Sequence, residues 1–217
     1  MKSLYVYSES TPLPILGVTE TNMKKTSEFY TKNAQAFFDS TVSVDAEELY
    51  RHFLPHIPAG GLILDAGCGS GRDANVFLNR GFQVEAFDAS EPLAALAAEL
   101  LGQKVSKCLF REFSSKDFFD GIWACASLLH VPLEELSETM RHLSSFLKAG
   151  GYFYCSFKYG QGEAEVGERH FTYMDEPGIE QLAKVSDLRV YQCWITPDLR
   201  PGREDEKWLN AILQLSV

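Results

Sequence analysis

Apolar and polar positions alternate along the chain with two periods, one typical of β-strands and one typical of α-helices. Residues 62–64, for example, form a short apolar run between two glycines and an aspartate, as a buried parallel strand does. The pattern predicts strands at residues 62–64, 82–87, 105–109, 121–125, 152–157, 188–195 and 208–215. It predicts helices at residues 72–79, 91–101, 133–147 and 177–183, with Gly81 ending the first and Ser90 capping the second.

This succession of strands and helices predicts an α/β fold with a doubly wound, Rossmann-like sheet. Helices cover both faces of such a sheet, and ligands bind outside the carboxyl ends of its strands. Residues 24–54 carry apolar positions at helical spacing, with a break near residues 40–43, which indicates two helices before the sheet. We therefore expect a loosely ordered arm at residues 1–22 and a single domain at residues 23–217, whose residues 23–57 form a helical cover.

Composition and charge narrow the possible partners. The chain has 217 residues and a formal net charge of -10, so the average surface field repels nucleic acid unless a local basic patch overrides it. The first residues lack the continuous apolar core of a secretory signal, and no apolar run approaches membrane-spanning length. We expect a cytoplasmic protein that binds neither nucleic acid nor membrane.

Cysteine and histidine spacing gives no sign of a metal site. The five cysteines are scattered without a CxxC pair, so we expect them to be reduced and mostly buried. His52 and His56 have a spacing that zinc ligands use, but Pro55 lies between them and no third ligand accompanies them. We expect no bound metal.

A glycine cluster between the first strand and the next helix carries the strongest chemical signal. Gly67, Gly69 and Gly71 alternate there in the spacing G-x-G-x-G. Glycine tolerates positive φ and has no Cβ, so the chain can pass close beside an adenosine group. The dinucleotide fingerprint is instead G-x-G-x-x-G, and Arg72 stands where it would continue. The spacing therefore disfavours NAD.

Two aspartates flank this cluster. Asp88 ends the next predicted strand, where its carboxylate can accept hydrogen bonds from both hydroxyls of a ribose. Asp65 precedes the glycines, and its carboxylate can fix the glycine loop and meet the amino group of a methionine-like tail. For either residue the simpler alternative is a turn or helix-cap role.

Together these segments resemble the class I methyltransferases that depend on S-adenosylmethionine (SAM). Residues 65–71 (Asp-Ala-Gly-Cys-Gly-Ser-Gly) resemble their motif I, and residues 85–88 (Glu-Ala-Phe-Asp) resemble their acidic-loop motif. Residues 119–130 look like the fourth strand with its loop, and residues 147–151 look like the turn before the fifth. The resemblance covers about residues 28–217, and within the superfamily the chain is similar to small bacterial methyltransferases of the general and tellurite-resistance type.

The resemblance implies SAM as cofactor, S-adenosylhomocysteine (SAH) as product, and a set of contacts. Asp88 would hold the ribose, Ala89 and Ser90 would flank the adenine, Arg72 would meet the carboxylate, and Tyr30 would close over the methionine end. The complete implied set is Tyr30, Asp65, Gly67, Gly69, Gly71, Arg72, Asp88, Ala89, Ser90, Phe110, Arg111, Ala126 and Ser127. One departure concerns residues 108–112, which read Cys-Leu-Phe-Arg-Glu where many relatives place an acidic residue for the adenine amino group.

The same resemblance makes the last strand antiparallel and brings three segments to the ligand edge of the seven-stranded sheet. These are the loop after strand four, a long loop over residues 158–173, and a hairpin at residues 196–207. His130 is a candidate general base because an ordinary imidazole titrates near neutrality, or else a structural loop residue. Arg169, Arg200 and Arg203 are candidates for binding an anionic acceptor, or else solvated surface arginines, and Tyr159 is a weaker candidate.

The leading hypothesis is therefore methyl transfer by in-line displacement to a small-molecule acceptor, an anionic one being among the options. One alternative is a protein or nucleic-acid acceptor, which the acidic charge disfavours. A second is a nicotinamide-dependent oxidoreductase on a related sheet, and a third is a SAM-binding module without catalysis.

Overall fold

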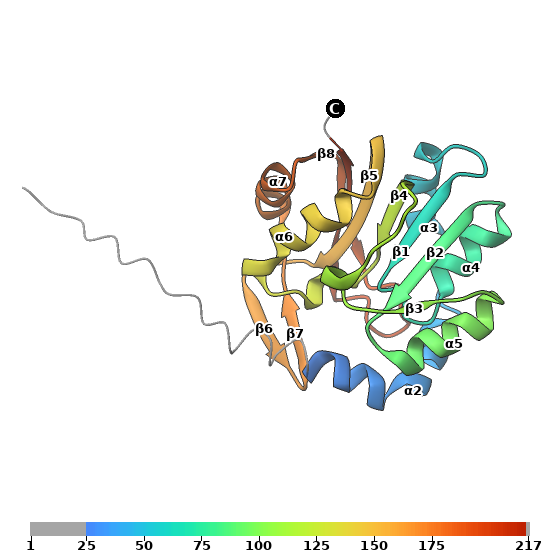
Figure 1. The fold of residues 1–217 in the computed structure, drawn as a ribbon. Helices are drawn as coiled ribbons and strands as arrows, with labels where there is room; N and C mark the ends of the chain where they lie inside the picture. Colours follow the sequence, from blue (N-terminus) through green and yellow to red (C-terminus); the bar gives the residue numbers. More distant parts are fainter. Residues whose placement is uncertain (1–24, 216–217) are drawn as a thin grey trace, which may run out of the picture.

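A seven-stranded, mostly parallel sheet with helices on both faces forms the centre of the computed structural model, which describes residues 25–215 (Figure 1). The strand order is β3-β2-β1-β4-β5-β9-β8. The strands of this sheet are β1 (Leu62–Ala66), β2 (Gln83–Asp88), β3 (Ser106–Lys107), β4 (Phe119–Ala124), β5 (Leu147–Lys158), β8 (Leu188–Pro197) and β9 (Lys207–Leu215). The main helices after β1 are α4 (Arg72–Asn79), α5 (Glu91–Leu101), α6 (Leu133–Ser144) and α7 (Glu176–Val185), with short 3-10 turns η2 (Phe110–Glu112) and η3 (Leu128–His130).

Strand directions agree with the predicted fold class. β1 pairs in parallel with both β2 and β4, and β4 pairs in parallel with β5. β9 lies between β5 and β8 and runs antiparallel to both. The doubly wound sheet with an antiparallel last strand is thus confirmed. Its order reverses between β1 and β4, the position where ligands bind in sheets of this kind.

The helices next to β1 and β2 have the predicted bounds, because local signals define both ends. Gly71 adopts a left-handed conformation at the start of α4, with φ of 75°. The Ser90 side chain accepts a hydrogen bond from Leu93 N and so caps α5, and Gly102 ends that helix with φ of 62°.

Other elements differ from the prediction. The segment 158–173, expected to be a loop, contains a separate antiparallel hairpin of β6 (Glu163–Val166) and β7 (Arg169–Thr172). β3 has only two residues, since it pairs with β2 alone at the sheet edge. α6 ends at Ser144, and β5 begins at Leu147, earlier than expected, with a register irregularity opposite β4.

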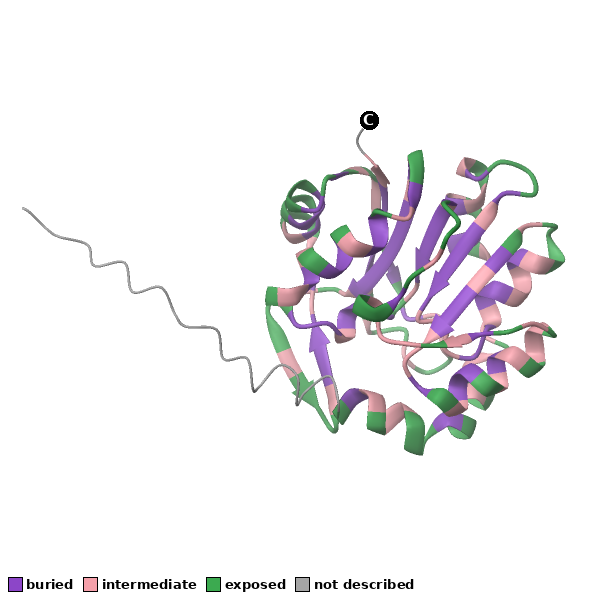
Figure 2. Cartoon of the chain, viewed as in Figure 1, coloured by how far each residue is buried: buried purple, intermediate pink, exposed green. Residues whose placement is uncertain are grey.

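Apolar side chains fill both faces of the sheet, while exposed residues lie on the outer sides of the helices (Figure 2). On one face α6 and α7 cover a cluster around Phe153 and Phe157. On the other face, α3 (Glu47–Phe53) and α4 cover Trp123 and Tyr154, whose rings stack with centroids 3.8 Å apart. Because both faces of the sheet are buried, the central strands are nearly continuous runs of apolar residues.

The first part of the helical cover, residues 25–41, lies over the carboxyl ends of the strands, whereas α3 packs on one face of the sheet. Residues 25–32 are helical, α2 (Ala34–Thr41) continues after a turn at Asn33, and α3 follows a break at residues 42–46, with the 3-10 turn η1 (Leu54–His56) after it. α2 contacts α5 at one end of the cover. At the other end Thr26 Oγ1 accepts a hydrogen bond from His170 N of β7 at 3.0 Å. The cover therefore bridges α5 and the β6–β7 hairpin (Figure 1). The predicted arm at residues 1–22 lies outside the described residues.

Candidate active site

A cavity of about 300 Å³ lies at the carboxyl ends of the central strands. Its walls come from the β1–α4 loop, the ends of β2 and β4, the cover, β7 and the β8–β9 loop. The predicted site residues that line it are Tyr30, Gly67, Gly69, Arg72, Asp88, Ala89, Ser90, Phe110, Ala126, Ser127, His130, Arg169, Arg200 and Arg203. One cavity thus collects residues separated by most of the chain.

Four predicted site residues do not line this cavity. Asp65 is buried beneath the glycine loop, where its Oδ2 accepts a hydrogen bond from Ala74 N at 3.1 Å. Gly71 faces α5, since a Cβ there would lie 3.0 Å from the Ala97 Cβ. Arg111 is exposed on η2, and the Tyr159 hydroxyl donates outside the cavity to Glu176. Asp65 and Gly71 therefore shape the loop from behind.

Close contacts between the β1 and β4 ends explain the glycine loop. Gly67 and Gly69 have φ of 75° and 55°. A Cβ on Gly67 would lie 2.7 Å from the Ser127 Cβ, and one on Gly69 would lie 3.1 Å from the Phe37 ring of the cover. Ser127 Oγ in turn donates to the Ala66 carbonyl at 2.7 Å. Only residues without side chains fit here, which leaves bare backbone along the cavity wall.

The Asp88 carboxylate is held in place by backbone groups. Its Oδ2 accepts from Gly69 N at 2.9 Å and its Oδ1 accepts from Ser90 N at 2.8 Å. Burial raises the pKa of Asp88, and the backbone N–H donors oppose that rise. Each carboxylate oxygen has two lone pairs, so each can accept one further hydrogen bond. The pair of oxygens beside the bare loop fits the two hydroxyls of a ribose.

A buried ion pair forms the floor beneath the loop. Asp73 accepts from Arg72 Nε at 2.6 Å, from Trp123 Nε1 at 2.8 Å and from the Tyr50 hydroxyl at 2.5 Å. Burial disfavours the Asp73 carboxylate, but the Arg72 charge and these hydrogen bonds hold its pKa below the ordinary value. Burial, and after it the Asp73 charge, raises the pKa of Asp65 well above normal. Asp73 is thus the ionised member of this carboxyl pair.

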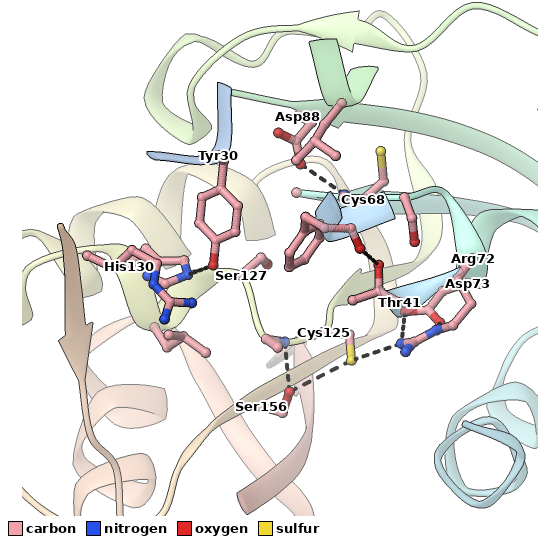
Figure 3. A pocket seen from close by; sticks show the side chains of 18 of the residues that line it. Tyr30, Thr41, Cys68, Arg72, Asp73, Asp88, Cys125, Ser127, His130 and Ser156 are labelled. Atoms are coloured by element: carbon pink, nitrogen blue, oxygen red, sulfur yellow. Dashed lines mark hydrogen bonds and ion pairs between the residues drawn. The ribbon is translucent and has the colours of Figure 1, made fainter. Parts of the chain in front are cut away.

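Cys125, beside Arg72 and Ser156 (Figure 3), and the following Ala126 complete the floor after β4. Cys125 Sγ lies 3.8 Å from Arg72 and 3.9 Å from Ser156 Oγ. Burial raises the pKa of Cys125 to about 12, so the thiol stays protonated and is not a nucleophile. Ala126 has φ of 51° and donates its N–H to Ser156 Oγ at 2.8 Å. Strained backbone of this kind is concentrated at functional sites.

Tyr30 and His130 meet on the other side of the cavity (Figure 3). His130 Nδ1 lies 2.7 Å from the His170 carbonyl, which can only accept, so Nδ1 carries the proton. The Tyr30 hydroxyl, 2.8 Å from His130 Nε2, therefore donates to that nitrogen. Burial lowers the pKa of His130 to about 4 and raises the pKa of Tyr30. Both side chains are neutral at pH 7.

The three predicted arginines differ in their surroundings. Arg200 forms an ion pair with Asp198, and Arg203 forms one with Glu206. Arg169 lies instead between aromatic rings, with its Cζ 4.6 Å from the Phe29 centroid and 5.1 Å from the Phe171 centroid. Among residues 25–215, Arg169 thus differs from the other two arginines in having aromatic rings in place of an acidic partner.

Sequence reasoning missed several lining residues. Asp73 stands in the first turn of α4, where an acidic residue is usually explained by the helix dipole. Cys125, Ser156, Phe171 and Asp198 also line the cavity. Cys125 and Ser156 stand near the ends of predicted strands and Asp198 stands in the predicted hairpin, which was the available signal. Phe171 lies in a segment that was expected to be a loop.

The family follows from comparison with known proteins. Residues 38–192 match a family model described as a methyltransferase domain. The chain belongs to this methyltransferase family. The match spans the glycine loop, Asp88 and the end of β4, and the fit of these residues to a nucleoside agrees with it. The protein is a SAM-dependent methyltransferase, whereas its similarity to the tellurite-resistance type stays a prediction.

Solved structures share the fold of this methyltransferase. The 1,6-didemethyltoxoflavin-N1-methyltransferase of Burkholderia thailandensis, solved with 1,6-didemethyltoxoflavin and SAH, is 20% identical with a TM-score of 0.76, covering 99% of both chains. The CcbJ methyltransferase of Streptomyces caelestis is 15% identical with a TM-score of 0.70, covering 89% of this chain and 99% of its own. The [4+2]-cyclase SpnF is 14% identical with a TM-score of 0.70, covering 91% of this chain and 97% of its own. At these identities the likeness concerns the fold alone.

Two further comparisons gave negative results. A search of curated proteins found no match to the methyltransferase. Within residues 25–215, no helix is both long enough and apolar enough to cross a membrane.

Proposed function

We propose that this methyltransferase transfers the SAM methyl group to a small-molecule acceptor bound inside the cavity. The observation that carries the proposal is the cover, which closes the ligand edge of the sheet. Thr26 is hydrogen-bonded to β7, and Tyr30 is hydrogen-bonded to His130 after β4. A cavity of about 300 Å³ lies at the small end of the range of roughly 300–1,000 Å³ typical of small-molecule sites. A protein or nucleic-acid acceptor would have to displace these contacts.

The cofactor side of the cavity follows from the residues described above. Asp88 would hold the ribose, Ala89, Ser90 and Phe110 would surround the adenine, and Arg72 and Tyr30 would face the methionine end. When bound there, SAM supplies a methyl group on a positively charged sulfur, ready for in-line displacement. The protein then has to orient the acceptor and exclude water, which are the main contributions to such a reaction.

His130 positions Tyr30 in this proposal and is not the general base. Its Nε2 lone pair already accepts the Tyr30 hydroxyl proton, and its Nδ1 proton is held by the His170 carbonyl. With a pKa of about 4, the imidazole is a poor proton acceptor at pH 7. The acceptor nucleophile therefore has to be reactive without help from this histidine.

The first test is ligand binding measured by calorimetry with SAM, SAH and NAD. We expect heat from SAM and SAH and none from NAD, and heat from NAD alone would contradict the proposal.

The second test uses radiolabelled SAM with a library of small-molecule acceptors, with bulk protein and with RNA. Label in the small-molecule fraction supports the proposal. Label only in protein or RNA, or SAM binding without transfer to anything, contradicts it.

A further inference from the structure

The cations that line the cavity are paired, with one exception. Arg72 is bound by Asp73 at 2.6 Å, Lys158 by Glu206 at 2.7 Å, and Arg200 by Asp198. Arg203 is bound by Glu206. Among residues 25–215, no aspartate or glutamate forms an ion pair with Arg169. Arg169 is the cation whose charge the described residues leave unmatched.

One N–H of Arg169, at the buried Nε, is also left without a hydrogen-bond partner among the described residues. A buried N–H without a partner destabilises the folded chain, so a ligand group that accepts a hydrogen bond from it binds favourably. The neighbouring Glu168, at the turn between β6 and β7, pairs with Lys32 and not with Arg169.

The guanidinium cannot easily turn away to solvent. Phe29 of the cover and Phe171 of β7 lie 4.6 and 5.1 Å from its Cζ, both within the range of a cation–π contact. A side-chain hydrogen bond with Arg169, and after it the Arg169 charge, oppose the rise in the pKa of Tyr30, and the same charge adds to the fall in the pKa of His130. Arg169 therefore sits at the acceptor side, beside the Tyr30–His130 pair.

We propose that Arg169 binds an anionic group of the methyl acceptor, so that the acceptors of this enzyme are small organic acids with a flat apolar body. This proposal rests on the proposed function above and names its substrate class. The planar guanidinium matches a carboxylate through paired N–H donors. The rings of Phe171 and Trp208, which line the cavity, offer apolar contacts for that body.

A carboxylate at Arg169 has two possible sources, the acceptor and the methionine end of the cofactor. Arg72 and the glycine loop lie on the far side of the cavity from the Tyr30–His130 pair (Figure 3). This arrangement favours the acceptor. An experiment that measures both ligands separately distinguishes the two sources.

The test uses benzoate and benzamide, which have nearly the same shape but differ in charge. Each is titrated by calorimetry into the wild-type protein, with and without saturating SAH, and the SAH affinity is measured in parallel. We expect benzoate to bind at least about tenfold more tightly than benzamide. Arg169→Gln should bring that ratio close to 1 with less than about a twofold change in SAH affinity, and Arg169→Lys should keep part of the ratio.

Arg51→Gln is the matched control, since Arg51 is an exposed arginine on α3 outside the cavity. It should keep both the ratio and the SAH affinity, and thermal unfolding checks that each variant is folded. A wild-type ratio near 1, or a ratio unchanged in Arg169→Gln, overturns the proposal. A loss of SAH affinity in Arg169→Gln that matches the loss of benzoate affinity also overturns it, by assigning Arg169 to the cofactor. Failure of the wild type to bind SAM or SAH counts against the proposed function, while the benzoate ratio without SAH still tests Arg169.

Discussion

The two sides of the cavity are built in different ways. The cofactor side consists of the glycine loop, Asp88 and Ser90, which lie within one βαβ segment and are joined through backbone N–H groups. In the proposed function the acceptor side consists of His130 and Arg169 with their neighbours, and Tyr30 lies at the border with the cofactor side. The hydrogen bonds of the acceptor side join residues 100 positions apart in Tyr30–His130 and 144 positions apart in Thr26–His170.

This difference explains why a family can be assigned more easily than a substrate. Backbone geometry on the cofactor side is set by a few glycines and one aspartate in a short stretch of sequence, which lies inside the segment that the family model matches. Side chains from remote segments form the other side, and they can change without disturbing the sheet. The [4+2]-cyclase SpnF has the same fold under a different activity, which shows how little the sheet decides the chemistry.

The largest expected effect concerns the floor of the cofactor side. Asp73→Ala leaves Arg72 as a buried charge without its partner, so the free energy of unfolding should fall by about 3–5 kcal/mol. Denaturant unfolding measures this change. Glu47→Ala, which breaks exposed pairs with Arg80 and Arg51, should have little effect by the same measurement. Equal losses in the two variants would contradict the view that the buried pair supports the loop.

Asp88→Ala should weaken SAH binding by roughly 100-fold, which corresponds to about 2.7 kcal/mol. The variant removes both the acceptor oxygens for the ribose and the hydrogen bonds that hold Gly69 and Ser90. Calorimetry measures the dissociation constant. Asp88→Asn keeps one acceptor oxygen and should lose less affinity. If Asp88→Ala binds SAH as tightly as the wild type, the proposal that the cofactor binds in this cavity is wrong.

His130 should make stability depend on pH. Its pKa of about 4 in the folded chain lies below the ordinary value of 6.5, so the unfolded chain takes up a proton first as the pH falls. Between pH 7.5 and pH 5, this difference should remove about 2 kcal/mol of the free energy of unfolding. His130→Gln cannot titrate and should lose correspondingly less over the same range. Parallel stability losses in wild type and variant would show that the imidazole is not kept neutral.

Tyr30→Phe should have the smallest effect. It tests whether the Tyr30 hydroxyl acts on the acceptor or on the cofactor. It removes one hydrogen bond to His130, worth about 1 kcal/mol, so kcat/KM for the acceptor should fall roughly fivefold. SAH affinity should stay within about twofold, since the ring itself is kept. If SAH affinity falls as much as kcat/KM, the Tyr30 hydroxyl belongs to the cofactor side.

The sequence predicted the local elements of the cofactor side better than the contacts between remote segments. Helices α4 and α5 have the predicted bounds because glycines and a serine cap mark their ends locally. The β6–β7 hairpin was expected to be a loop, because its residues do not alternate clearly and its contacts outside the hairpin are with remote segments, η3, β5 and Thr26 of the cover. The Asp73 network was missed because Tyr50 and Trp123 are remote in sequence and meet only in the fold.

The position of β9 has a consequence for how the molecule is made. This strand is the last in the described chain, yet it fills the gap between β5 and β8. Until the ribosome has added these residues, β5 and β8 each have an edge without a partner strand. Unpaired strand edges promote aggregation. Nascent chains halted before residue 207 should therefore depend on chaperones, although the segment with the glycine loop and Asp88 is already complete.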